Sequence, residues 1–100
     1  MGGNLMAGLF AATVDSLVIG KEGIGKIFTG DLSVLIEGKP AARLSSMVSP
    51  YPPEKVISEI ITGSQSVIVG GLNMTRGTDI NNLLDKVDNT TCATSVVVGP

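Results

Sequence analysis

The feature of this sequence that most restricts its fold is an internal repeat with an offset of 33 residues. Residues 27–46 read IFTGDLSVLIEGKPAARLSS, residues 60–79 read IITGSQSVIVGGLNMTRGTD, and seven of the 20 aligned positions are identical without a gap. The identical pairs are Ile27/Ile60, Thr29/Thr62, Gly30/Gly63, Ser33/Ser66, Val34/Val67, Gly38/Gly71 and Arg43/Arg76. A repeat at a fixed offset indicates that one small structural unit occurs more than once in the fold.

Two shorter matches flank the repeat. Residues 16–20 read SLVIG and residues 95–99 read SVVVG, and both place three apolar residues between a serine and a glycine. The C-terminal match fits a partial third repeat at about residues 90–99, and the N-terminal match is weaker. Because 100 residues is the size of one domain, we expect a single domain over residues 1–100.

Each repeat has the pattern of a β-hairpin. In the first, short strands are predicted at 27–29 and 33–36, with a turn beginning at Gly30 and the pair ending at Gly38. Pro40 has no backbone N–H, so it breaks the pairing or lies at a sheet edge. Glycine-rich composition with small and β-branched apolar residues suits short strands joined by tight turns. The sequence therefore predicts an all-β fold.

One segment has a helical pattern. Ile80, Leu83, Leu84 and Val87 follow the i, i+3, i+4, i+7 spacing of an amphipathic helix. We expect one short helix near 79–88, packed on the β core because so short a helix is marginal alone.

The residue types exclude most catalytic chemistry. The chain has no histidine, which removes the commonest general base and zinc ligand, and its single cysteine, Cys92, has no activating partner. We therefore expect no catalytic site and a structural Cys92. The net charge is −2 with no basic run, so nucleic acid is not an expected partner. The apolar stretch 6–14 is too short to cross a bilayer and lacks the basic start of a signal peptide, so synthesis in the cytoplasm is expected.

Two alternative functions remain open at this stage. The segment Gly20–Lys26, GKEGIGK, matches the nucleotide-binding pattern GxxxxGK, but Ile27 stands where a serine or threonine should hold magnesium. A β pattern follows in place of the phosphate-binding helix, which favours a glycine-rich turn. The second alternative is a generic β-repeat protein that assembles through strand edges.

Four side chains are candidates for contact with a partner. Arg43 and Arg76 recur at matching positions, which favours a hydrogen bond inside each repeat over a partner contact. Leu72 and Met74 lie where the second repeat should loop out, so they are either partner-facing or part of the core.

The segment 34–43, VLIEGKPAAR, resembles the signature of the PAAR-repeat family, in which a glycine-bounded hairpin leads into the tetrad Pro-Ala-Ala-Arg. Residues 40–43 match the tetrad, whereas the second copy, residues 73–76, keeps only its arginine. The resemblance covers roughly residues 10–99. It implies structural roles for the motif residues Gly30, Gly38, Pro40, Ala41, Ala42, Arg43, Gly63, Gly71 and Arg76.

The resemblance also implies a fold and a function. Members of the family form a compact cone of short antiparallel strands with pseudo-threefold repeats. One monomer caps the blunt end of a trimeric β-helical spike in contractile injection machines such as phage tails and type VI secretion systems. This implies a spike trimer as partner, transient contact with a target membrane, and a location at a virion tail tip or on a secretion machine.

The sequence departs from the family at the apex of the cone. Family members usually hold a metal there, with two histidines and a cysteine among the ligands. Through the glycine alignment those ligand positions fall near Gly23, Lys55 and Asp85, and these residues do not support the usual site. We therefore expect no metal and no cofactor, with the predicted helix 79–88 closing the apex by apolar packing.

Overall fold

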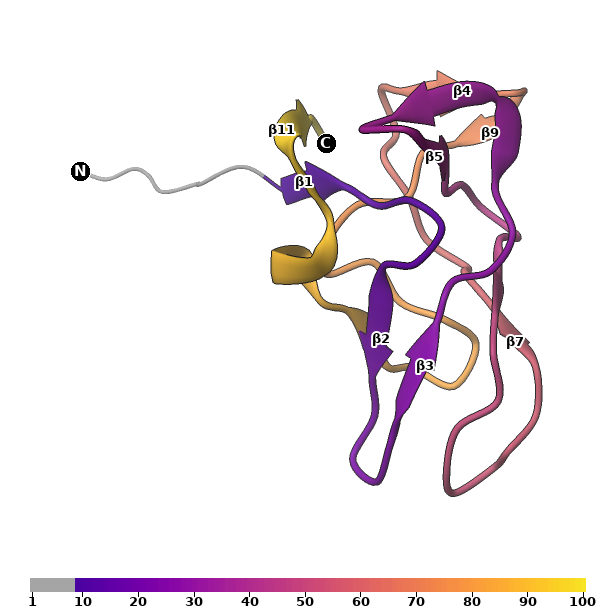
Figure 1. Cartoon of the computed structure of the whole chain (residues 1–100). Helices are drawn as coiled ribbons and strands as arrows, with labels where there is room; N and C mark the ends of the chain where they lie inside the picture. The colour runs from indigo at the N-terminus through magenta and orange to yellow at the C-terminus, as the bar shows by residue number, and fades with distance from the viewer. Residues whose placement is uncertain (1–8) are drawn as a thin grey trace.

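The computed structural model describes residues 9–100 and consists almost wholly of short antiparallel strands (Figure 1). The first eight residues, which belong to the predicted domain and include the start of the apolar stretch 6–14, lie outside the described residues. The strands are β1 (Leu9–Ala11), β2 (Leu17–Ile19), β3 (Ile24–Lys26), β4 (Asp31–Ile36), β5 (Lys39–Ala41), β6 (Met47–Val48), β7 (Ser58–Glu59), β8 (Ile68–Val69), β9 (Leu72–Asn73), β10 (Lys86–Val87) and β11 (Ala93–Val98). A 3₁₀ turn covers Asn89–Thr91. The prediction of an all-β fold is confirmed.

The predicted helix at 79–88 is wrong. The segment instead makes two isolated bridges, turns, and continues into β10, which pairs with β2. The side chain of Asn81 explains the difference, because its Oδ1 accepts hydrogen bonds from the backbone N–H of Leu83 (3.2 Å) and of Asp85 (2.9 Å). These contacts take donors that a helix would use, and Leu84 has a φ of 66°, outside the right-handed helical region.

The predicted pairing within each repeat is also wrong. Strand β4 pairs with the residues after Gly38, in β5, and β8 pairs with β9 across residues 70–71. Gly38 and Gly71 therefore lie inside the hairpin turns, with φ of 82° and 85°, and do not end the hairpins. The residue before each glycine also has positive φ, as two-residue hairpin loops require.

A third hairpin unit joins the two ends of the chain. Strand β11 pairs with β1, with Val98 opposite Leu9 and Val97 opposite Phe10. In Figure 1 the first and last strands lie side by side at the upper left. The register makes this pair equivalent to β4–β5 and β8–β9. The fold therefore contains three equivalent strand pairs, two formed by continuous hairpins and one by strands from opposite ends of the described chain.

The three units meet in a ring of backbone hydrogen bonds. Ala12 donates to the carbonyl of Thr75 (3.0 Å), Thr75 donates to Ala42 (3.0 Å), and Ala42 donates to Ala12 (2.9 Å). All three residues have no exposed surface. A closed cycle of three equivalent bonds defines a pseudo-threefold axis through the centre of the molecule.

A capped turn follows each member of the ring. The backbone N–H groups of Thr13, Arg43 and Arg76 donate to the side chain three residues later, at 3.0, 3.0 and 2.7 Å. In each turn the third residue has positive φ, between 71° and 81°. The same local geometry thus occurs in three units although the residue types differ: the first residue is arginine in two turns, and the capping residue is serine in two.

The core has two layers along this axis. One layer lies between the hairpins and the ring and contains Ala11, Ala41, Val69, Met74 and Val98. The other includes the ring residues Ala12 and Ala42 and, beyond them, Val18, Ile27, Val48, Tyr51, Ile60, Val87 and Cys92. Among residues 9–100, none of the helical structure is long and apolar enough to cross a membrane.

Candidate functional site

The two ends of the molecule differ in structure and are the candidate sites (Figure 1). The hairpin end consists of the pairs β4–β5, β8–β9 and β1–β11. The apex consists of the turn at 20–23, the loop at 50–57 and the turn at 82–85. Each end receives one segment from each of the three units.

The hairpin end presents three equivalent aliphatic side chains to solvent. Leu35 is 61 % exposed, Ile68 is 55 % exposed and Val97 is 63 % exposed. Each is the middle residue of a run of three apolar residues, and its neighbours on both sides are at least partly buried against the core. Strand alternation alone directs the middle residue outward. This apolar triad was not identified from the sequence, although the middle position of each run marks it.

The hairpin end also presents open strand edges. Within the described residues, β4, β8 and β11 each pair with one strand, β5, β9 and β1 respectively. The second edges of β5, β9 and β1 are bonded to the neighbouring unit, since the carbonyls of Pro40, Asn73 and Phe10 accept from Val14, Leu44 and Gly77. The open edges are therefore those of β4, β8 and β11. Open edges carry backbone groups that can pair with strands of another protein.

The two repeated arginines are half-buried and contact the hairpins. Arg43 Nη1 donates to the carbonyl of Gly70 (2.9 Å) and lies 3.5 Å from a carboxylate oxygen of Asp31. Arg76 Nη1 donates to the carbonyl of Gly99 (3.2 Å), and its Nη2 lies 3.1 Å from Asp79 Oδ1. Both guanidinium groups thus tie one unit to the hairpin of the next.

The other motif residues lie around the ring and the hairpins. Ala41 and Ala42 are fully buried, and Pro40 lies in β5, where its carbonyl accepts from the N–H of Val14 (2.9 Å). A Cβ on Gly30 would lie 2.7 Å from the carbonyl oxygen of Ala41, the last residue of β5. A Cβ on Gly63 would lie 2.9 Å from the carbonyl oxygen of Met74, which follows β9. These positions therefore serve close backbone packing.

The two candidates for partner contact in the second repeat differ in burial. Met74 is 3 % exposed and packs in the core layer beneath the hairpins, so its side chain cannot face a partner. Leu72 is half-buried in β9.

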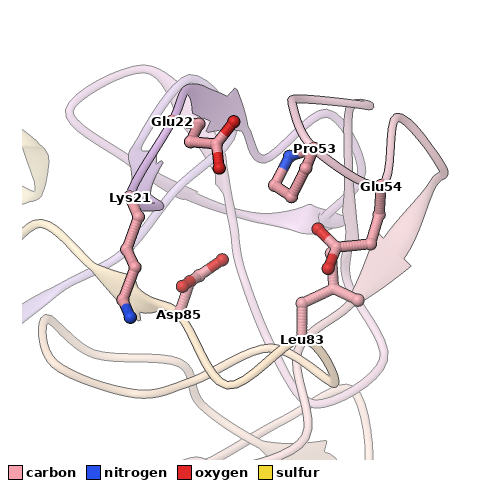
Figure 2. Close-up of a pocket in the computed structure, with 6 residues that line it drawn as sticks. All are labelled: Lys21, Glu22, Pro53, Glu54, Leu83 and Asp85. Atoms are coloured by element: carbon pink, nitrogen blue, oxygen red, sulfur yellow. The ribbon is translucent and has the colours of Figure 1, made fainter.

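The apex encloses a shallow pocket of about 210 Å³ (Figure 2). Its lining comes from all three apex segments and comprises Lys21, Glu22, Pro53, Glu54, Leu83 and Asp85. Beneath it lies Tyr51, which is 2 % exposed and belongs to the core.

The hydroxyl of Tyr51 is the centre of a hydrogen-bond network. It donates to Asp85 Oδ2 (2.5 Å) and accepts from Asn81 Nδ2 (2.8 Å). Asn81 Nδ2 also donates to Ser58 Oγ (2.9 Å). Burial, together with the hydrogen bond to Asp85, raises the pKa of Tyr51 to about 12, so its hydroxyl stays protonated at neutral pH.

The ligand positions implied by the family do not fit a metal. Gly23 offers no side chain, Lys55 is an exposed cation, and Asp85 already accepts from Tyr51. Within residues 9–100 there is no group of three or more histidine, cysteine, aspartate or glutamate side chains placed to hold a metal ion. Cys92 packs in the core, where burial raises the pKa of its thiol to about 11.

The GKEGIGK segment forms a hairpin turn. It connects β2 to β3, which pair antiparallel, and Lys26 ends β3. Gly20 donates to the carbonyl of Gly23 (2.9 Å) within the turn. The strand, loop and helix arrangement of a nucleotide-binding loop is not present in this segment.

These features define a class of protein: a small β protein built from three pseudo-equivalent units, with three equivalent exposed aliphatic side chains at the hairpin end and a shallow pocket at the apex. The profile of the PAAR motif matches residues 22–82, which is more than half of the chain. The chain belongs to the PAAR motif family, a structural family of spike-tip proteins in contractile injection systems. No curated protein matches the sequence.

Proposed function

We propose that this protein caps the blunt end of a trimeric β-helical spike, with one copy per trimer, and gives the spike its point. The apolar triad at the hairpin end carries the proposal. Three aliphatic side chains on equivalent strands, Leu35, Ile68 and Val97, are between 55 and 63 % exposed. Exposed apolar groups that repeat around an axis suit a partner with the same symmetry.

The pseudo-threefold axis explains how one monomer can match three identical chains. Each hairpin would contact one subunit of the trimer through the same kind of surface. The open edges of β4, β8 and β11 supply backbone groups for pairing with the last strands of the spike. Apolar contact and strand pairing together would orient the cap along the spike axis.

The apex would then point away from the spike, toward the target membrane, which it would contact transiently during piercing. This orientation places the protein at a virion tail tip or on a secretion machine. Nucleotide binding gains no support, because the GKEGIGK segment is an antiparallel hairpin turn.

A matched pair of charge substitutions tests this docking face. Ile68→Glu alters the hairpin end, whereas Ile57→Glu alters a side chain of nearly equal exposure (57 % against 55 %) near the apex. We expect Ile68→Glu to weaken binding to the cognate spike at least tenfold in titration calorimetry. Ile57→Glu should bind as the unaltered protein does.

Equal binding by both variants would contradict the proposed docking face. Self-association of the isolated protein through its strand edges, measured by sedimentation, would favour a generic assembly protein over a cap. Circular dichroism of both variants verifies that the fold is retained.

A further inference from the structure

The apex is held by one side chain that contacts all three units. Tyr51 comes from the loop between β6 and β7, and its hydroxyl reaches Asp85 and Asn81 in the turn before β10. Its ring lies against the β2–β3 hairpin, where a Cβ on Gly20 or Gly25 would be only 2.7 or 2.6 Å from ring carbons. The absence of side chains at these two glycines thus makes room for the ring.

From this geometry we infer that Tyr51, with Asp85, Asn81 and Ser58, closes the apex in the role that a bound metal has in relatives. A metal at such a point joins ligands from several segments. Here the tyrosine ring and hydroxyl join the same three segments with packing and hydrogen bonds. The inference concerns the apex alone and does not depend on the spike as partner.

The network leaves little capacity for a metal. Asn81 makes all of its side-chain bonds, because Nδ2 donates to Tyr51 and Ser58 while Oδ1 accepts from the backbone of Leu83 and Asp85. The Tyr51 hydroxyl both donates and accepts, so it is satisfied as a neutral phenol. Asp85 Oδ2 accepts from this phenol, so the carboxylate offers a metal only its remaining acceptor sites.

The neighbouring segment reinforces the closure. A Cβ on Gly23 would lie 2.5 Å from Cδ of Pro52, so the turn of the β2–β3 hairpin packs directly on the residue after Tyr51. At Gly23, where the family resemblance implies a metal ligand, the Pro52 ring therefore fills the space that a ligand side chain would need.

The first test is the metal dependence of the unaltered protein. We expect elemental analysis of the purified protein to find no stoichiometric zinc or iron. Thermal unfolding in chelator, and again with added zinc, should give the same midpoint within about 2 °C, because nothing that binds the folded state is gained or lost. A bound metal, or a midpoint that falls in chelator or rises by more than about 5 °C with zinc, would overturn the inference.

The second test removes the hydroxyl and keeps the ring. Tyr51→Phe leaves the buried Asn81 and the Asp85 carboxylate without this partner, and we expect its unfolding midpoint to fall by about 10 °C. Glu54→Gln is the matched control, since it alters an exposed carboxylate of the same pocket and should change the midpoint little. Added zinc should raise the unfolding midpoint of neither variant.

A Tyr51→Phe protein as stable as the unaltered one would contradict the inference, as would recovery of its stability by zinc. If Tyr51→Phe does not fold, the metal dependence of the unaltered protein still decides the question. None of these measurements involves the spike, so failure of the apex inference is distinguishable from failure of the proposed capping function.

Discussion

At the scale of single residues, Tyr51 is both the most informative side chain and the easiest to observe. It is the only tyrosine of a chain without tryptophan, so its ultraviolet spectrum reports one position in the core. Its hydroxyl donates to the Asp85 carboxylate and its ring is 2 % exposed. Ionising this phenol would place a second negative charge beside a carboxylate in a buried site.

We predict that Tyr51 in the folded protein titrates with a midpoint pH of about 12, whereas the unfolded chain titrates near 10.0. A pKa raised in the folded state means that folding holds the proton more tightly. The corresponding stability is complete below about pH 10 and is lost as the pH rises toward 12. Absorbance of the tyrosinate, followed with and without urea, measures both midpoints.

Tyr51→Phe is the control for the stability measurement, because it lacks the ionising hydroxyl. The unaltered protein should lose more unfolding free energy between pH 10 and 12 than the variant does. A folded protein whose tyrosine titrates near pH 10 would show that the hydroxyl is not buried against Asp85.

At the scale of elements, the hairpin turns depend on glycine. Gly38 and Gly71 have φ of 82° and 85°, and a Cβ at either position would meet no atom within 4 Å. The cost of any side chain there comes from the backbone conformation alone, since left-handed φ is unfavourable for residues with a Cβ.

We predict that Gly71→Ala lowers the free energy of unfolding by about 1 kcal/mol, measured by urea unfolding. Gly71→Asn should cost less, because asparagine tolerates positive φ. Gly99→Ala is the control, since Gly99 is not among the positive-φ residues and a Cβ there makes an ordinary contact of 3.4 Å. Equal losses at positions 71 and 99 would refute the backbone explanation.

The elements also show what the sequence could and could not predict. The 33-residue offset and the motif Pro40–Arg43 were sufficient for the β class and the family, because repetition and residue type are visible in the chain itself. The pairing of β4 with β5 could not be predicted, because a glycine within a hairpin turn and a glycine that ends a hairpin look alike in sequence. The helix at 79–88 failed because the Asn81 side chain captures backbone donors, a contact that apolar spacing does not encode.

The candidate site was predictable to a similar degree. The sequence alone predicted that the apex lacks the family's usual metal ligands, because glycine and lysine stand at positions 23 and 55. The role of Tyr51 could not be predicted, because it depends on two glycines about thirty residues upstream and on a turn about thirty residues downstream. The partial repeat at about residues 90–99 was visible in the sequence, but its pairing with β1 was not, because the two strands lie at opposite ends of the chain.

At the scale of the whole molecule, the pairing of β1 with β11 makes the fold circular. Leu9 lies opposite Val98, so the ends of the described chain are adjacent. We predict that a circular permutant with Pro100 joined to Met1 and new ends between Glu37 and Gly38 folds and unfolds within about 5 °C of the unaltered protein. Such surface turns tolerate new chain ends.

A second permutant supplies the contrast. Opening the chain between Leu44 and Ser45 interrupts the capped turn beside the ring, where Ser45 donates to the carbonyl of Ile60 at 2.9 Å. This permutant should unfold at a clearly lower temperature. If both permutants were equally stable, the ring of three units would not be the structural centre of the fold.

The measurement that tests the central claim most directly is the native mass of the protein mixed with its cognate spike. The pseudo-threefold axis and the apolar triad Leu35, Ile68 and Val97 predict a complex with one copy of this chain for three spike chains. A complex with three copies per trimer, or no complex with the cognate spike, would contradict the account.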